Sequence, residues 1–152
     1  MKKIASSSID KFFSSPAFAI IGVSGDQKKF GNIVYRAMKE RILSVYPVNP
    51  RLSTVEGDKC YSSILEVPDS VKTAIIVIPP QATERVIADC VQKGIRTLWM
   101  QPGSESGRAM EEAETNGITV ISGHCLLMFL EPVTSAHAFH RWVNKFVGAY
   151  PK

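Results

Sequence analysis

The chain has 152 residues and a formal net charge of +4, a length that suits one domain with a single core. This charge is too small to indicate a nucleic-acid-binding protein by itself, and no apolar run approaches the roughly 20 residues that span a bilayer. The first residues include lysines but lack the apolar segment of about 7–15 residues that a signal peptide needs. We therefore expect a cytoplasmic protein without nucleic-acid or membrane partners.

The first half of the chain predicts a helix over 7–14, followed by an apolar strand over 17–22. The strand reads as buried on both faces because its apolar residues are continuous rather than alternating. A helix follows over 29–42, where apolar residues recur at helical spacing. The second strand covers 43–48, and Pro47 limits it to a strand end or an edge because proline has no N–H for the ladder.

The second half continues the alternation after a loop over 52–60 and a short helical turn. Strands are again marked by apolar runs, and helices by periodicity and by glycine stops such as Gly94. The predicted elements are strand 71–78, helix 82–93, strand 95–100, helix 105–116, strand 118–121 and a last helix over about 134–147.

Strands that alternate with helices of about a dozen residues indicate right-handed crossovers and a parallel sheet. We therefore expect one α/β, Rossmann-like domain over 1–152, with its core at about 15–130. The sheet should have five parallel strands in the order 3-2-1-4-5, with helices on both faces. Ligands of such sheets bind at the carboxyl ends of the strands, where the strand order reverses. That point would lie between strands 1 and 4.

The loop after the first strand, within FAIIGVSGDQKKFGN at 18–32, has the layout of a phosphate-binding turn. It departs from GxGxxG, because Ser24 and Gln27 occupy the later glycine positions. A helix N-terminus attracts phosphate through its unpaired N–H groups and its dipole. Gly22 and Gly25 would allow a tight turn and close approach, Gly31 would let the helix start lie against the strand, and Ser24, Lys28 and Lys29 would contact phosphate. A connection that merely needs small residues is the alternative.

The end of the second strand distinguishes between nucleotides. An NAD site places an acid there for the ribose 2′-hydroxyl, but this chain has Asn49, Pro50 and Arg51. An arginine suits an additional ribose phosphate, as in NADP or coenzyme A. Arg51 is also the last of six basic residues between positions 28 and 51, which contain a single acid. They predict either a local positive field or a solvated helix face.

Six segments in order resemble a stand-alone CoA-binding domain, similar to the N-terminal domain of succinyl-CoA synthetase alpha subunits. They are AIIGVSGDQKKFGN, VYPVNPR, EGDKCYSSILEVP, AIIVIPPQAT, KGIRTLWMQPG and GITVISGHCL. The resemblance implies binding of CoA or an acyl-CoA through its 3′-phospho-ADP part, with adenine beside Ile78 and Pro79. The expected binding residues are Gly22, Val23, Ser24, Gly25, Lys28, Lys29, Gly31, Asn32, Asn49, Pro50, Arg51, Ile78, Pro79, Thr83 and Gln101.

The sequence offers no nucleophile–base pair, carboxylate pair or metal-ligand set that predicts catalysis. Cys60, Cys90 and Cys125 are odd in number and lack CxxC spacing, which argues against disulfides; we expect Cys90 in the core. In the segment before Cys125, His124 departs from the related small proteins, and its role is left open.

We expect a binding module without catalysis; the alternatives are an NADP-dependent oxidoreductase and a nucleotide-sensing regulatory subunit. A protein partner or homo-oligomer is compatible with each.

Overall fold

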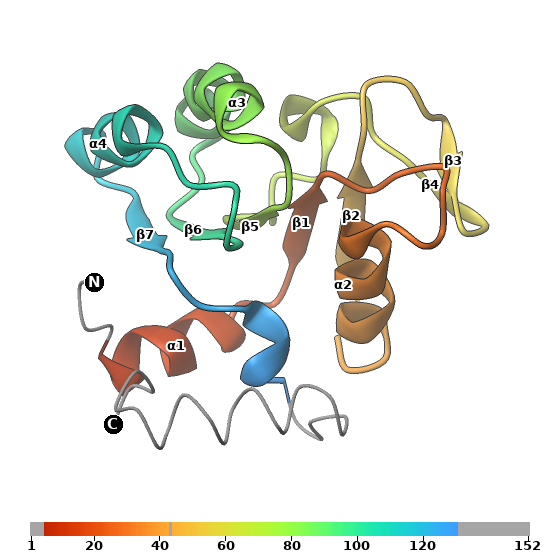
Figure 1. Ribbon diagram of the computed structural model, residues 1–152, viewed down its shortest axis with the longest axis horizontal. Helices are drawn as coiled ribbons and strands as arrows, with labels where there is room; N and C mark the ends of the chain where they lie inside the picture. Colours follow the sequence, from red (N-terminus) through yellow and green to blue (C-terminus); the bar gives the residue numbers. More distant parts are fainter. Residues whose placement is uncertain (1–4, 43, 131–152) are drawn as a thin grey trace.

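Five short strands form one parallel sheet in the computed structural model, which describes residues 5–42 and 44–130 (Figure 1). They are β1 (Phe18–Ile21), β2 (Val45–Val48), β5 (Thr73–Ile76), β6 (Thr97–Met100) and β7 (Thr119–Ile121), in the order β2-β1-β5-β6-β7. All neighbouring pairs are parallel. The predicted α/β fold with five parallel strands is therefore confirmed.

The predicted strand order was wrong. Counted along the chain, the observed order is 2-1-3-4-5, so the second strand lies at the edge and the third pairs with β1. Pro47 suits this edge position because it has no N–H to donate to a further strand. Its carbonyl, on the side opposite β1, accepts from the Tyr61 N–H, 2.9 Å away. The strand order consequently reverses between β1 and β5, rather than between the first and fourth strands.

Helices cover both faces of the sheet, as predicted (Figure 1). α1 (Ser6–Phe13) and α2 (Phe30–Lys39) lie on one face, and α3 (Pro80–Lys93) and α4 (Gly107–Thr115) on the other. Successive strand residues point to opposite faces, so Phe18 and Ile20 join the core with α1 and α2. Ala19 and Ile21 join the core that holds the α3 residue Cys90, which confirms the predicted core position of that cysteine.

The predicted loop over 52–60 contains a small antiparallel hairpin, β3 (Thr54–Val55) and β4 (Asp58–Lys59). Its turn residues Glu56 and Gly57 have φ of +47° and +85°. Two short helical turns, η1 (Ile64–Glu66) and η2 (Leu126–Met128), complete the described elements. The helix predicted at about 134–147 lies outside the described residues. Among the helices described, none has the length and apolar character needed to cross a membrane.

Candidate functional site

Three loops meet where the strand order reverses: 22–29 after β1, 49–53 after β2 and 77–79 after β5. Hydrogen bonds join these loops to one another and to the end of β1. The Asn49 side-chain amide donates to the Val23 carbonyl at 2.7 Å, and the Val77 N–H donates to the Ile21 carbonyl at 2.8 Å. The structure thus brings most of the predicted binding residues to one edge of the sheet, on loops of defined conformation.

Two glycines set the path of the first loop. Gly22 has φ of +121°, and a Cβ on it would lie 2.2 Å from the Val77 carbonyl oxygen. A Cβ on Gly31 would lie 2.1 Å from the Gly22 carbonyl oxygen. No side chain fits at either distance, so the start of α2 lies directly against the end of β1, as expected for Gly31.

Asn32 locks the inner half of this loop. Its side chain is completely buried, accepts from the Ser24 N–H at 2.7 Å and donates to the Ser24 carbonyl at 2.8 Å. The side chain of Asn32, predicted to bind the ligand, is therefore engaged in holding the loop. The Ser24 hydroxyl accepts from the Asp26 N–H at 3.1 Å, an arrangement that leaves its own proton available to a ligand.

The outer half of the loop is exposed. At Gly25, an added Cβ would have Leu52 Cδ2 as its nearest described neighbour, at 3.8 Å, so no described atom requires glycine there. Lys28 and Lys29 are exposed, and their ammonium groups have no hydrogen bond or ion pair with any described residue. The loop therefore presents free positive charge and an open backbone at the N-terminus of α2.

The six basic residues of this region fall into two groups. Arg36, Lys39 and Arg41 of the α2 segment are paired, with Glu56, Asp58 and Glu40 respectively. Arg51 is exposed, like the two loop lysines, and its guanidinium has no partner in the described part of the chain. Asn49 fixes the turn before it by accepting from the Arg51 N–H at 2.8 Å. Among the described residues, three unpaired cations thus flank the loops, Arg36 and Lys39 hold the β3–β4 hairpin, and Arg41 pairs within its own helix segment.

The remaining predicted residues differ in accessibility. Pro50 and Pro79 are exposed and Ile78 is half-buried. Thr83 is buried, and its hydroxyl donates to the Pro79 carbonyl at 3.3 Å. Gln101 is also buried: its Oε1 accepts from the Leu126 N–H, whereas its Nε2 has no partner among the described residues. The structure does not bring Thr83 or Gln101 to the exposed edge with the others.

Two contacts of this region were not predicted from the sequence. Arg36 donates to the Gln27 carbonyl of the first loop at 3.1 Å. The Glu105 carboxylate accepts from the N–H groups of Gly103 and Gly123, which ties the loops after β6 and β7 together. Arg36 and Gln27 are nine residues apart and Glu105 and Gly123 are eighteen apart, and no local motif marks either contact. In the sequence, each contact is marked only by a polar residue that belongs to no recognisable motif.

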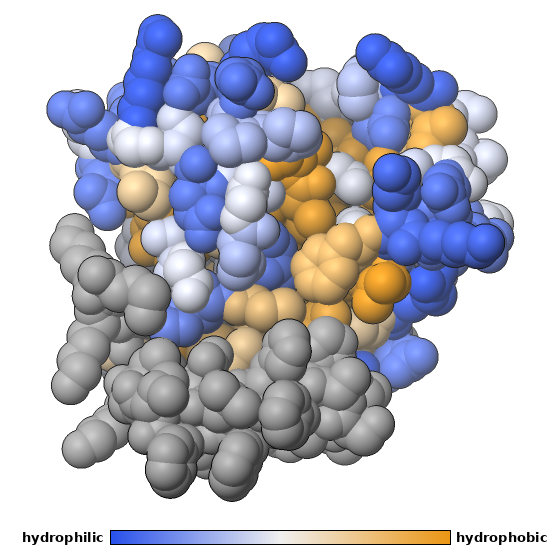
Figure 2. Space-filling model, viewed as in Figure 1, coloured by the Kyte–Doolittle hydropathy of each residue, from blue (hydrophilic) through white to orange (hydrophobic). Residues whose placement is uncertain are grey.

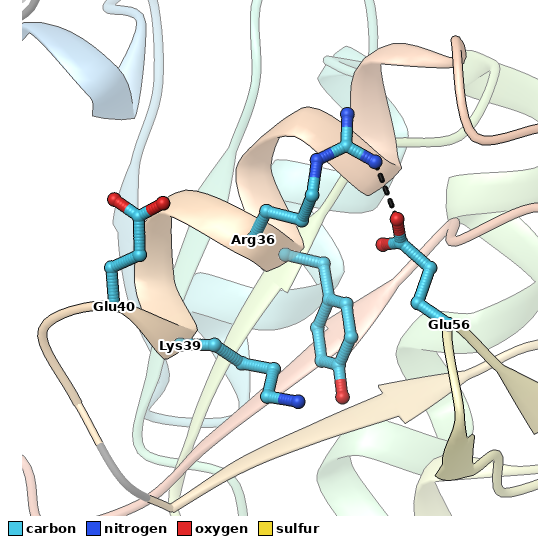
Figure 3. A pocket seen from close by; sticks show the side chains of 5 residues that line it. Arg36, Lys39, Glu40 and Glu56 are labelled. Carbon is cyan, nitrogen blue, oxygen red and sulfur yellow. Dashed lines mark hydrogen bonds and ion pairs between the residues drawn. The ribbon is translucent and has the colours of Figure 1, made fainter.

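A pocket of about 370 Å³ lies between α2 and the β3–β4 hairpin, lined by Tyr35, Arg36, Lys39, Glu40 and Glu56 (Figure 3). None of the residues predicted to bind the nucleotide lines this pocket. Figure 2 shows apolar side chains in the central hollow of the viewed face, with hydrophilic side chains around it. Phe30 and Ile33, at the start of α2, are 40% and 37% exposed, so apolar surface adjoins the cationic loop.

Burial shifts the pKa values of the described thiols and of the one described histidine. Burial raises the pKa of Cys60 and of Cys125, and that of Cys90 to about 12, which disfavours the reactive thiolates. Burial lowers the pKa of His124, whose carbonyl accepts from Trp99 Nε1 at 3.0 Å. All three cysteines are free. Cys60 and Cys90 lie in the two apolar clusters, and Cys125 packs against one of them.

Comparisons with known proteins identify the family of this chain. A family model described as CoA binding domain matches residues 16–131. The alpha subunit of the ADP-forming acetate–CoA ligase II of Pyrococcus furiosus is 34% identical over 129 residues, which cover 78% of this chain and 28% of that protein. The matches to two further ADP-forming acetate–CoA ligases, from Archaeoglobus fulgidus and Methanocaldococcus jannaschii, cover 21% and 18% of their lengths. The chain thus spans less than a third of these curated relatives.

Solved structures show the same fold. A conserved hypothetical protein of Pyrococcus furiosus is 34% identical with a TM-score of 0.69, over 72% of this chain and 95% of that one. The apo form of the dinucleotide-forming acetyl-coenzyme A synthetase 1 of Ca. Korarchaeum cryptofilum is 28% identical with a TM-score of 0.66, over 74% and 27%. Together with the family match over most of its length, these similarities show that the chain belongs to the CoA-binding domain family.

Proposed function

We propose that this protein binds CoA or an acyl-CoA through the 3′-phospho-ADP part, at the edge formed by the loops after β1, β2 and β5. The observation that carries the proposal is the set of three exposed cations without described partners, Lys28, Lys29 and Arg51, on two of these loops. Membership of the CoA-binding domain family supports the identity of the ligand.

The diphosphate would lie on the first loop. The N-cap of α2, Lys29, provides no side-chain cap for the first-turn N–H groups, and a helix N-terminus attracts phosphate through its dipole and these donors. Gly25 leaves room for close approach, and the Ser24 hydroxyl and the two lysines add donors. The apolar surface of Ile78 and Pro79, across from this loop, suits the adenine ring.

Arg51 would bind the phosphate on the ribose. A guanidinium forms strong, directional hydrogen bonds with phosphate oxygens, and the Asn49 turn holds the Arg51 backbone in place. NADP also carries a ribose phosphate, but on the 2′-oxygen, and is the alternative ligand. The family match favours CoA over NADP.

We also propose that the chain has no catalytic activity of its own. Burial raises the pKa of each of its three thiols, and it matches only a minor part of each ligase relative. The proposal includes a cytoplasmic location, and it requires neither a protein partner nor a second copy. Incubation with acetate, ATP and CoA should release no ADP; steady ADP release by the purified chain would contradict this part.

Thermal unfolding with a panel of nucleotides tests the ligand. A ligand at about 100 times its dissociation constant stabilises a protein by roughly 2.7 kcal/mol. We expect CoA and acetyl-CoA to raise the melting temperature most, dephospho-CoA less, and NAD and ATP least. A shift with NADP and none with CoA would overturn the proposal in favour of the oxidoreductase alternative.

A further inference from the structure

The outer half of the first loop, residues 26–28, has few attachments. The Lys28 N–H donates to Asp26 Oδ1 at 3.0 Å, the Lys29 N–H donates to the Asp26 carbonyl at 3.1 Å, and Ser24 accepts from the Asp26 N–H. These bonds are internal to the loop and its helix start. Within 5–42 and 44–130, the one hydrogen bond that ties residues 26–28 to another element comes from Arg36.

Arg36 uses both terminal nitrogens. Nη2 donates to the Gln27 carbonyl at 3.1 Å, and Nη1 forms an ion pair with Glu56 Oε1 (Figure 3). Glu56 lies in the hairpin turn with φ of +47°, a left-handed conformation that residues with a side chain seldom adopt. The guanidinium thus joins the loop, α2 and the hairpin turn, and its planar fork suits two acceptors in different directions.

We propose that Arg36, held by Glu56, is a positioning residue for the diphosphate part of the CoA site. Its bond to the Gln27 carbonyl fixes the outer half of the loop. This bond thereby fixes the positions of Lys28 and Lys29, which directly follow Gln27 in the sequence. This inference rests on the proposed function, since it assigns the diphosphate to the first loop. Arg36 itself need not touch the ligand.

The chain offers a closely matched control on the same helix. Lys39 lies about one turn after Arg36, and the two side chains are 43% and 44% exposed. Lys39 pairs with Asp58 of the same hairpin, but the structure gives it no contact with the first loop. Arg36→Gln and Lys39→Gln therefore each remove one positive charge and one link to the hairpin, and only Arg36→Gln removes the link to the loop.

Calorimetric titration of the two variants with CoA and with adenosine 3′-monophosphate, which has no diphosphate, tests the assignment. Loss of one hydrogen bond and its fixed geometry should weaken CoA binding by Arg36→Gln about three- to tenfold. Binding of the monophosphate should stay unchanged in both variants, and Lys39→Gln should keep its CoA affinity within about twofold, as an exposed charge contributes little. Equal losses in the two variants, or an equal loss for the monophosphate, would overturn the inference.

The ion pair between Arg36 and Glu56 allows a second test. Glu56→Gln should weaken CoA in the same direction as Arg36→Gln, and the double variant should be no worse than the single one, because both changes release the same group. Arg36→Lys should not restore binding, since one ammonium cannot replace a fork that spans two acceptors. Full additivity of the two substitutions, or full rescue by lysine, would contradict the proposed bridge.

A measurement without ligand separates this inference from the proposed function. Amide hydrogen exchange at Lys28 and Lys29 in the free protein should accelerate in Arg36→Gln and not in Lys39→Gln, because the loop loses its external attachment. If the wild-type protein fails to bind CoA, the proposed function falls while this measurement still decides the role of Arg36 in the loop. Unchanged exchange in Arg36→Gln would reject that role.

Discussion

At the residue scale, the basic residues of this region differ in whether an acidic side chain lies within reach. Arg51 follows an asparagine whose side chain holds the turn, and its guanidinium extends from an exposed position. Arg36 and Lys39 belong to the same basic stretch of sequence but pair with acids of the β3–β4 hairpin, and Arg41 pairs with the adjacent Glu40. Sequence identified the positive stretch, and the fold decides which charges stay available.

Arg51→Ala should weaken CoA much more than dephospho-CoA, which lacks the 3′-phosphate. The expected loss for CoA is about 1.5–3 kcal/mol, as for a hydrogen bond to a charged group, measured by calorimetric titration. Arg96→Ala is the control, because Arg96 is also exposed but precedes β6, at the opposite edge of the sheet. Equal weakening of both nucleotides would remove Arg51 from the 3′-phosphate.

Gly31→Ala should affect the stability of the fold, whereas Gly25→Ala should affect the binding of CoA. Alanine at position 31 would place Cβ 2.1 Å from the Gly22 oxygen, and we expect a loss of unfolding free energy of about 1–3 kcal/mol, typical of overpacking. The added Cβ of Gly25→Ala meets no atom of residues 5–42 and 44–130 within 3.4 Å, so this change should leave stability unchanged while weakening CoA binding. Urea denaturation would measure the stability of both variants, and calorimetric titration would measure their CoA binding. A Gly31→Ala protein as stable as the wild type would contradict the close contact.

At the scale of elements, the β3–β4 hairpin is attached to α2 by side chains. Asp58 accepts from the Tyr35 hydroxyl at 2.6 Å and from Lys39. The hydrogen bonds from Lys39 and Tyr35 lower the pKa of Asp58, and burial is the main cause that raises the pKa of Tyr35. The attachment therefore depends on an ionised Asp58.

This pKa shift predicts a pH dependence. A carboxyl group with a depressed pKa stabilises the fold above its unfolded value, and this contribution disappears as pH falls through the folded value. Asp58→Asn should thus be less stable than the wild type at pH 7, by under about 1 kcal/mol because the pair is partly exposed. The gap should shrink below about pH 4, in urea titrations at several pH values. A gap that persists at pH 2 would exclude this cause.

Elements were predictable where hydrophobic patterns are long. The continuous apolar runs marked the five strands, and helical spacing marked α2 and α3, with Gly94 at the end of α3 in the left-handed conformation. The hairpin was missed because two-residue strands carry no periodicity and Glu56-Gly57 is not a usual turn pair. Strand order was misjudged because both orders satisfy right-handed crossovers, although Pro47 already favoured an edge.

The site was predictable to the level of loops. The loops after β1 and β2 lie together because the carboxyl ends of parallel strands share an edge. The pairing of Asn32 with Ser24, and of Arg36 with Gln27, depends on how α2 lies against the loop. Such contacts follow from the three-dimensional path of the chain, which spacing in the sequence does not encode.

At the scale of the whole molecule, the sheet has a firm centre and a less supported edge. β1, β5 and β6 each pair on both sides, whereas β7 pairs only with β6 among the described residues. Two separate apolar clusters cover the faces of the sheet. Two of the three ligand loops follow the best-supported strands, β1 and β5, so ordering of these two loops by a ligand acts on a rigid base; the third follows the edge strand β2.

Amide exchange should reveal this arrangement. We expect the slowest exchange in β1, β5 and β6, and faster exchange in β7, because central strands open only with large parts of the fold. CoA should further slow exchange in the loops at 24–29 and 49–51, and leave the opposite edge unaffected. Exchange in β7 as slow as in β5 would contradict the expected order of stability.

The contact between Gly31 and the Gly22 carbonyl has a practical consequence for redesign. It pins both ends of the first loop, and Asn32 pins its inner half, so the exposed stretch between them can be exchanged as a unit. Libraries that retain Gly22, Gly31 and Asn32 and vary residues 25–28 should yield folded proteins with altered nucleotide preference. Modest lengthening is tolerable as well, since the entropy of closing a loop grows only slowly with its length.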